Sequence, residues 1–367
     1  MTPAEALATY LRPRSATVSP VPLDLEISSH IREQGVGPLV YRAMREYRLL
    51  DAQPAGVRNE LARLSREEAL IEPFRRDEAA RMVGALAAAG VNALIFKGTA
   101  LAYTHYPEPC LRPRVDTDLL IRKEHIDTAA RVFESAGSTR ALRTSGQHVT
   151  HQFTYVSTRH GLSFAFDVHW KISDPQDFAN LFSFEELERD AQPVPLLGPA
   201  AKALDDEHAL LVACTHRVAH HYDREILIDL CDIDLLARRL GAPAWDRVVT
   251  MATAKCIRRV TLRGLELASS RLGTEVPVRV RRELSESAAA DERTTAYLAA
   301  GLRKVDILRA DLAQLGWRGR LRLLREHLFP HPAFVLQSFG RTQPLLLPAL
   351  YLIRIARGAS AWFRPLR

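Results

Sequence analysis

Apolar residues recur at intervals of three and four along most of the first 90 positions of the chain. This spacing places the apolar side chains on one face of a helix, and it predicts helices across residues 23–90. The last of these runs ends at Gly90, and glycine commonly follows the final turn of a helix. We therefore expect an N-terminal helical region over residues 1–90.

After Gly90 the pattern changes to short apolar runs that are rich in β-branched and aromatic residues. Runs of this kind, bounded by turn residues, predict strands. Strands are expected at residues 91–97, 115–122, 152–158 and 162–170. Helical patterns follow the first and second runs, and Arg159-His160-Gly161 favours a hairpin turn between the last two. A small α/β core with a mixed sheet is therefore expected over residues 91–200.

The helical period returns at about Asp205 and continues to about residue 325. The proline-rich segment at 191–202 is the expected link between the core and this second helical region. The sequence therefore predicts the α+β class, with a small mixed-sheet core flanked by N-terminal helices and a larger C-terminal helical domain over residues 201–367.

The composition fits a globular protein, since 47% of the 367 residues are hydrophobic and 25% are charged. The net charge of +7 is concentrated in one place: residues 301–367 hold twelve Lys or Arg and three acids, which leaves the rest of the chain with a slight negative surplus. Such a basic tail can contact nucleic acid, an anionic membrane surface or a phosphorylated substrate. Solvated helix faces produce the same count.

Other features narrow the class of protein. The four cysteines form no Cys-x-x-Cys pair, which argues against a zinc ribbon or a disulfide framework. The longest uncharged apolar stretch, residues 342–353, is about half of the ~20 residues that a spanning helix needs. It predicts a buried helix rather than an interfacial anchor, so we expect no transmembrane segment and do not favour peripheral membrane contact. The first residues lack the basic and apolar parts of a secretory signal, and we expect a cytoplasmic protein.

Acidic residues interrupt two of the predicted strands. Asp116 and Asp118 are two positions apart, so both point to the same face of their strand, about 6.5–7 Å from one another. Carboxylates at this spacing repel each other unless a cation lies between them, and a divalent metal is the usual partner. Asp167 lies in an apolar run of a neighbouring strand, where an unpaired charge would be costly. The three acids predict a site for Mg²⁺ or Mn²⁺ of the kind used in phosphoryl or nucleotidyl transfer.

The segment Lys97-Gly98-Thr99 lies where the first predicted strand meets a helix. Gly98 lets backbone N–H groups approach an anion closely, the hydroxyl of Thr99 adds a donor, and the start of a helix favours negative charge. Lys97 can neutralise triphosphate charge or be a solvated strand end. The segment predicts a cradle for the phosphates of a nucleotide, facing the metal site.

Further side chains are candidates for the same site. Arg112 and Arg114 precede the two aspartates, and they are expected either to contact phosphate or to pair with those aspartates. His169 lies on the same strand face as Asp167, where it can orient an acceptor or a metal-bound water, or pack beside a neighbouring tryptophan. Lys171 follows in the same segment.

The helices after residue 205 supply the expected opposite wall. His216 and Asp229 are candidates for contact with the acceptor or the nucleotide, and Asp232 is an alternative to Asp229. We expect a cleft between residues 95–172 and the helices that contain these side chains, with residues 301–367 outside the catalytic shell.

The motifs resemble those of the nucleotidyltransferase superfamily typified by DNA polymerase β. Its members share a glycine and a hydroxyl residue after the first strand, Asp-x-Asp on the second and a third acid on a later strand. More narrowly, FKGTALAYTHYPEPCLRPRVDTDLLI followed by FDVHW is similar to a bacterial group described as an uncharacterised nucleotidyltransferase family. This similarity covers about residues 90–172 and is looser beyond them.

The resemblance implies transfer of a nucleoside monophosphate from an NTP such as ATP to a hydroxyl-bearing acceptor. Gly98 and Thr99 would bind the β- and γ-phosphates, Asp116 and Asp118 would hold both metals, and Asp167 would complete the second metal site and help to activate the acceptor hydroxyl. Thr99 stands where serine is common in the superfamily, but this departure removes no metal ligand. The acceptor, whether a small molecule, a peptide or RNA, is not identified by the resemblance.

Two other functions are open on the sequence alone. The chain could be a catalytically silent relative that binds nucleotide or serves as a scaffold, although the presence of all three acids argues against this. It could also be a toxin-like transferase directed at tRNA or another RNA through the basic residues 301–367. That segment has few interleaved aromatic residues and no recognisable RNA-binding module.

Overall fold

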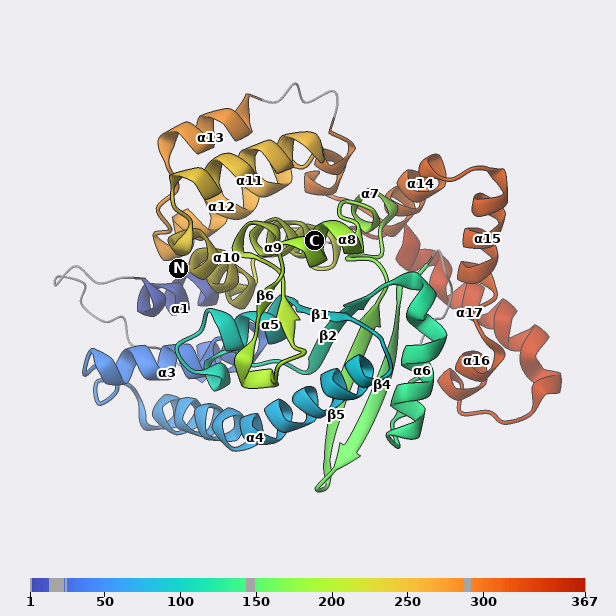
Figure 1. Cartoon of the computed structure of the whole chain (residues 1–367), viewed down its shortest axis with the longest axis horizontal. Coiled ribbons are helices and arrows are strands. Elements are labelled where there is room, and N and C mark those ends of the chain that lie inside the picture. The colour runs from blue at the N-terminus through green and yellow to red at the C-terminus, as the bar shows by residue number, and fades with distance from the viewer. Residues whose placement is uncertain (1, 13–22, 24, 143–148, 287–291, 367) are drawn as a thin grey trace.

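The computed structural model describes residues 2–12, 23, 25–142, 149–286 and 292–366. One mixed sheet lies at the centre, with helices from both ends of the chain around it and a further group of helices at the C-terminal side (Figure 1). The α+β class predicted from the sequence is therefore confirmed.

The sheet has seven strands in the order β3-β4-β5-β2-β1-β7-β6. The strands are β1 (Ala93–Phe96), β2 (Asp116–Ile121), β3 (Thr139–Arg140), β4 (Gln152–Arg159), β5 (Leu162–His169), β6 (Gln192–Pro193) and β7 (Lys202–Ala203). β2 pairs antiparallel with β1 and parallel with β5, and β5 pairs antiparallel with β4. The four longer strands are those expected from the sequence. His160 and Gly161 join β4 to β5 with φ of 53° and 74°, as a tight hairpin turn requires.

Helices before and within the core follow the predicted pattern. They are α1 (Pro3–Leu11), α2 (Leu25–Glu33), α3 (Gly37–Glu46), α4 (Ala55–Ala88), α5 (Lys97–Thr104) and α6 (Ile126–Ser135). The 34-residue α4 continues through Pro73 and ends just before Gly90, whose φ of 76° turns the chain into β1.

The second half of the chain is almost wholly helical. Its helices are α7 (Gln176–Ala179), α8 (Phe184–Arg189), α9 (Asp206–Ala219), α10 (Leu227–Arg239), α11 (Ala242–Ala254), α12 (Arg258–Leu272), α13 (Val278–Ser285), α14 (Lys304–Gln314), α15 (Trp317–Leu328), α16 (Pro332–Ser338) and α17 (Leu347–Trp362). In Figure 1, α9–α13 gather beside the sheet near the N-terminus, and α14–α17 form a separate group at the other side.

One face of the sheet is covered by α4 and α6. Ile95 and Leu119 point to this face and share a buried core with Met82 and Leu86 of α4 and Phe133 of α6. The alternation of side chains along each strand sends the neighbouring residues to the other face.

The opposite face packs against the C-terminal helices. Leu94, Phe96 and Leu120 belong to a core that they share with α9 and α10. Asp118 lies two positions before Leu120 and pairs in register with Asp167 of β5, so both carboxylates point to this second face. The sheet therefore presents its acids toward the helical part of the chain.

The segment at 191–202, which we expected to link two domains, takes part in the sheet. It contributes β6 and the first residue of β7, and β7 pairs parallel with β1 at Leu94 and Ile95. Strands of two residues leave little periodic signal in a sequence, which is why its proline content predicted only a linker.

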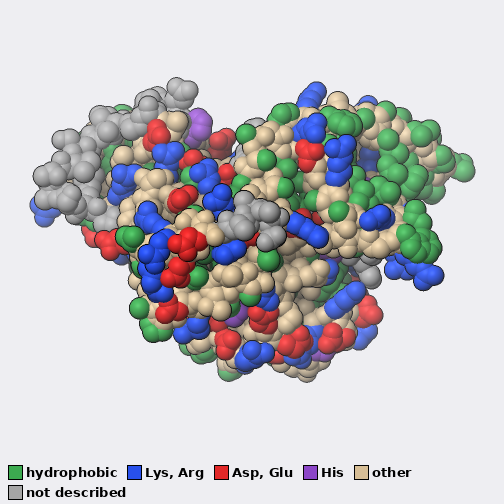
Figure 2. Space-filling model, turned by 90° about the horizontal axis from the view of Figure 1, so that it is seen from above, with side chains coloured by type: hydrophobic (Ala, Val, Ile, Leu, Met, Phe, Trp, Pro, Cys, Tyr) green, Lys and Arg blue, Asp and Glu red, His purple; other side chains and the backbone are tan. Residues whose placement is uncertain are grey.

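The expectation that residues 342–353 form a buried helix is wrong. This stretch runs into α17, and Leu345 and Leu352 remain 94% and 69% exposed. Figure 2 shows hydrophobic side chains gathered at the end of the molecule formed by the C-terminal helices. Among the described residues, every helix is too short or too polar to cross a bilayer.

Candidate functional site

A cleft of about 790 Å³ lies between the acidic face of the sheet and the C-terminal helices. Its walls come from α2, α4, β1, α5, β2, β4, β5, α9 and α10, with the loops that join them. The cleft expected between the core and α9–α10 is therefore confirmed. The contribution of α2 and α4 was not expected, and none of the described residues in 301–366 lines the cleft.

Lys97 joins β1 to α5 in a left-handed backbone conformation, with φ of 55°. Such a conformation is strained for a residue with a side chain, and such residues gather at functional sites. It directs the ammonium to Asp118, with 2.8 Å between Nζ and Oδ1. His169 Nε2 lies 2.8 Å from the same oxygen, so two side chains meet on one buried carboxylate.

These contacts determine the protonation states of Asp118 and His169. Burial alone would raise the pKa of Asp118, but the Lys97 ammonium and the hydrogen bond from His169 outweigh it and hold the pKa below its ordinary value. Burial, reinforced by Lys97, lowers the pKa of His169. At neutral pH the site therefore holds an ionised Asp118 carboxylate beside a neutral His169 imidazole.

Asp167 is buried beside Asp118 and is held from the hairpin strand β4. Thr154 Oγ1 and Gln152 Nε2 donate hydrogen bonds to its two carboxylate oxygens, at 2.5 and 2.8 Å. Asp118, Asp167 and His169 each offer a ligand atom, and these atoms lie within 4.8 Å of one another. Two carboxylates suit Mg²⁺ or Mn²⁺, and an imidazole bonded to one of them can orient that ligand. The residues present therefore fit such a metal.

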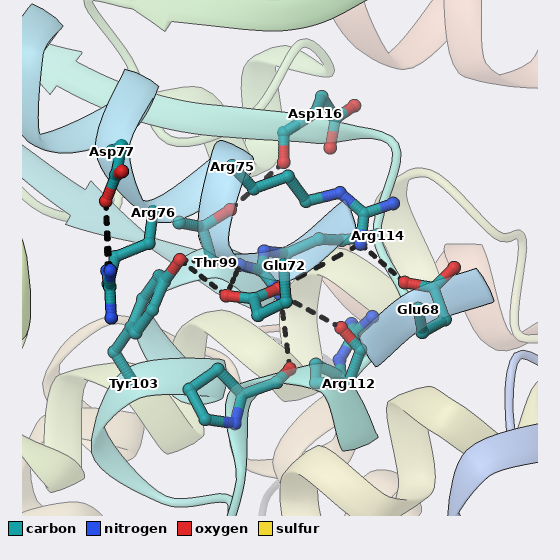
Figure 3. Close-up of polar contacts among 11 residues, drawn as sticks. Glu68, Glu72, Arg75, Arg76, Asp77, Thr99, Tyr103, Arg112, Arg114 and Asp116 are labelled. Carbon is teal, nitrogen blue, oxygen red and sulfur yellow. Dashed lines mark hydrogen bonds and ion pairs between the residues drawn. The ribbon is translucent and has the colours of Figure 1, made fainter. Parts of the chain in front are cut away.

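Asp116 lies on the same strand face and lines the cleft, half-buried, but it falls outside this close group of ligand atoms. Its backbone carbonyl accepts a hydrogen bond from Thr99 Oγ1 at 3.0 Å, as Figure 3 shows. The Thr99 hydroxyl thus ties the start of α5 to β2. Arg75 of α4 also lines the cleft and pairs with Glu68, 2.5 Å away.

Arg112 makes a buried, two-pronged ion pair with Asp232 of α10. Its Nε and Nη2 donate to the carboxylate at 2.9 and 2.8 Å, and Tyr106 donates to the same carboxylate at 2.7 Å. A Cβ atom at Gly98 would lie 3.0 Å from the guanidinium carbon. Gly98 therefore makes room for the arginine that joins the core to the opposite wall of the cleft.

Arg114 pairs instead with α4. Its Nη2 lies 2.8 Å from Glu72 Oε1, and the hydroxyl of Tyr103 donates to the same oxygen at 2.6 Å (Figure 3). Both arginines are thus held by acids from distant parts of the chain. They also line the cleft, where they add positive charge beside the aspartates.

Histidines form the opposite wall. His216 and His220 stack with ring centroids 4.6 Å apart, and His221 Nδ1 lies 2.5 Å from Asp229 Oδ2. Burial, with help from the Lys97 charge, lowers the pKa of His220 to about 3 and also lowers the pKa of His216. His216 and His220 are therefore neutral at physiological pH. They line the cleft together with Asp229.

Lys171 is half-buried, and burial lowers its pKa, but it is absent from the lining of the cleft in the described structure. The sequence interpretation also missed residues that hold the site together. Thr154 could have been found, because a two-residue turn at His160 and Gly161 fixes a register that pairs Thr154 with Asp167. Glu72 could not have been singled out from the sequence, because charged residues occur along the whole of α4 and nothing distinguishes Glu72 from the others.

Comparison with known proteins agrees with this geometry. Residues 26–273, more than half of the chain, match a family described as uncharacterised nucleotidyltransferase, and the matched span runs from α2 to the end of α12. No curated protein matches the chain. The matched residues include every element that lines the cleft. The chain therefore belongs to the uncharacterised nucleotidyltransferase family.

Proposed function

We propose that the protein is a metal-dependent nucleotidyltransferase of the DNA polymerase β-like superfamily. It transfers a nucleoside monophosphate from an NTP, with ATP as the first candidate, to a hydroxyl group of an acceptor. The observation that carries this proposal is the pairing of Asp118 with Asp167 on adjacent strands, facing a cleft that also holds Lys97 and two arginines. Acids that hold a metal, placed beside cations that hold phosphate, are the parts that nucleotidyl transfer requires.

Asp118 and Asp167 would hold Mg²⁺ or Mn²⁺, with Asp116 at the edge of the site. The bound metal would neutralise phosphate charge and lower the pKa of an attacking hydroxyl. His169 keeps the carboxylate of Asp118 in position through its hydrogen bond. Thr154 and Gln152 do the same for Asp167, so the protein holds the two acids in place before a substrate arrives.

The phosphates of the NTP would lie against the start of α5. Among the described residues, no side chain caps the first N–H groups of this helix, so the backbone around Gly98 and Thr99 can donate to an anion. The Lys97 ammonium, 2.8 Å from Asp118 Oδ1, lies beside the carboxylates that would hold the metal, and it could contact a phosphate bound at the start of α5. Arg112 and Arg114 strengthen the positive potential of this wall.

The acceptor would enter from the side of α9 and α10. His216 and His220 offer uncharged nitrogen atoms there, and Asp229 orients the neighbouring His221. Such a wall suits a hydroxyl group, to which a neutral imidazole can accept or donate a hydrogen bond. His169 is bonded to Asp118, and neither His169 nor Lys171 belongs to the described lining of the cleft, so we assign neither of them to the acceptor.

The proposal is tested by supplying the full chain with each NTP labelled at the α-phosphate or at the γ-phosphate, together with Mg²⁺ or Mn²⁺ and a cell extract. Nucleotidyl transfer moves the α-label to an acceptor and releases the γ-label in pyrophosphate. Asp167→Asn should abolish transfer, and the exposed Asp246→Asn is the matched control. Transfer of the γ-label alone would show a phosphotransferase, and nucleotide binding without transfer would show a silent relative.

A further inference from the structure

The surface of α17 reverses the usual distribution of apolar residues on a helix. A stripe that we call the α17 stripe faces outward and consists of Leu345, Ala349, Leu352, Ile353, Ala356 and Phe363. The spacing of these residues, mostly three and four, places them on one side of the helix and the turn that precedes it. A helix of a globular protein normally turns such a side toward the core.

The other side of α17 is fixed to the protein. Leu350 is buried, the Tyr351 hydroxyl donates to the carbonyl of Pro330 at 2.7 Å, and Arg354 donates to the carbonyl of His327 at 2.8 Å. These contacts hold α17 against α15 and the turn before α16. The α17 stripe is therefore exposed because of how the helix is anchored.

Exposed arginines lie before, within and after the α17 stripe along the chain: Arg341, Arg357 and Arg364. The sequence contains no acidic residue after Glu326. Exposed apolar side chains interspersed with arginines, with Trp317 and Phe329 exposed at the two ends of α15, have the composition of a surface that meets anionic lipid headgroups.

We propose that the α17 stripe docks on an anionic membrane surface. The helix would lie in the plane of the interface, with Leu345, Leu352 and Phe363 below the headgroups and the arginines at the level of the phosphates. The 16 residues of α17 are too few to span a bilayer, so the contact is peripheral. This inference is independent of the proposed transferase activity, because no described residue of this segment lines the cleft.

Two other occupants fit the surface less well. A second copy packed on the same surface would bring together two copies of residues 327–367, which contain arginines and no acid to pair with them. RNA would match the charge, but single strands stack their bases on aromatic side chains and duplexes are contacted by polar side chains, whereas the α17 stripe is mainly aliphatic. Lipid satisfies the charge and the aliphatic surface together.

The test is flotation of the full chain with vesicles of phosphatidylcholine and phosphatidylglycerol, compared with vesicles of phosphatidylcholine alone. We expect binding to the mixed vesicles only, weakened by added salt because the attraction is screened. The variant L345S/L352S/I353S should lose at least about tenfold in affinity, since each side chain would give up apolar burial. R341Q/R357Q/R364Q should lose about fivefold for each arginine at low salt.

The matched control is L70S/V278S, which removes two exposed apolar side chains from other parts of the surface. It should bind like the wild type, and thermal unfolding should confirm that all variants are folded. The proposal is overturned if the wild-type chain does not float with the mixed vesicles, or if the aliphatic variant floats as well as the control. A stable dimer that the aliphatic variant dissociates, or RNA binding without flotation, would likewise overturn it in favour of the other occupant.

Discussion

Lys97 and Asp118 form an ion pair in the lining of the cleft, with 2.8 Å between Nζ and Oδ1. The spacing of Asp116 and Asp118 predicted a cation between them, with a divalent metal as the usual partner. The protein supplies a cation of its own, placed there by a left-handed backbone conformation at the end of β1. Asp118 therefore has a cationic partner even when no metal is bound.

Removing Asp118 should reduce stability as well as activity. Asp118→Ala leaves the Lys97 ammonium and His169 without their buried partner, and we expect the free energy of unfolding to fall by about 3 kcal/mol. Asp118→Asn keeps an acceptor oxygen and should cost less, while turnover is lost in both. Urea denaturation measures the difference in the free energy of unfolding. Equal stability of the wild type and Asp118→Ala would show that the ion pair contributes no net stability.

Replacing Lys97 should separate metal binding from nucleotide binding. In Lys97→Met the ammonium no longer competes for Asp118, so we expect Mn²⁺ to bind several-fold more tightly. NTP should bind about tenfold more weakly, because a cation that contacts phosphate is lost. Calorimetry measures both affinities, with the exposed Lys202→Met as the control. Weaker Mn²⁺ binding would mean that Lys97 supports the metal site rather than competing for it.

The histidine wall should make stability depend on pH. The pKa of His220 is lowered to about 3 in the folded chain, compared with about 6.5 when unfolded. Between these values the unfolded chain binds a proton that the folded chain does not, so the free energy of unfolding falls as the pH falls, by about 1.4 kcal/mol per pH unit. His220→Gln should reduce this dependence of the unfolding free energy on pH, by up to about 1.4 kcal/mol per pH unit near pH 5 and less as the pH approaches 6.5. Urea denaturation at several pH values measures the slope. If the pH dependence of the unfolding free energy were the same in His220→Gln and in the wild type, it would arise from groups other than His220.

Gly98→Ala should disturb the link between the core and α10. The added Cβ would lie 3.0 Å from the Arg112 guanidinium, which must then move from Asp232. Because a buried ion pair that loses its geometry leaves its charges poorly compensated, we expect a loss of about 2–4 kcal/mol in stability. Gly84→Ala, on an open helix surface, is the control. Thermal unfolding that leaves Gly98→Ala like this control would mean that Arg112 can shift at no cost.

Several of these features could be predicted from the sequence because they follow local patterns. Short apolar runs bounded by turn residues located the four long strands, and the spacing of Asp116 and Asp118 gave the face that carries the acids. The expected third acid, Asp167, interrupts one of these runs, and it lies opposite Asp118 in the register of the sheet. Each of these inferences needed only a local run of residues or the period of a strand.

Other features depend on contacts between distant segments. Arg112 is 120 positions from Asp232, and Arg114 is 42 from Glu72, so neither partner could be chosen from spacing. The positive φ of Lys97 could not be predicted from the sequence either, because lysine rarely adopts a left-handed conformation. The exposure of α17 contradicted its apolar composition, which predicts burial for a helix unless an outside partner is known.

We propose that Asp118 and Asp167 hold a divalent metal in the cleft, and electron paramagnetic resonance of Mn²⁺ added to the full chain, with and without NTP, measures this binding. We expect Mn²⁺ to bind the wild type and the control Asp246→Asn, and to bind more tightly when NTP is present. In both Asp118→Asn and Asp167→Asn, the affinity for Mn²⁺ should fall at least about tenfold. Wild-type Mn²⁺ affinity in either of these two variants would show that the two carboxylates do not hold the metal.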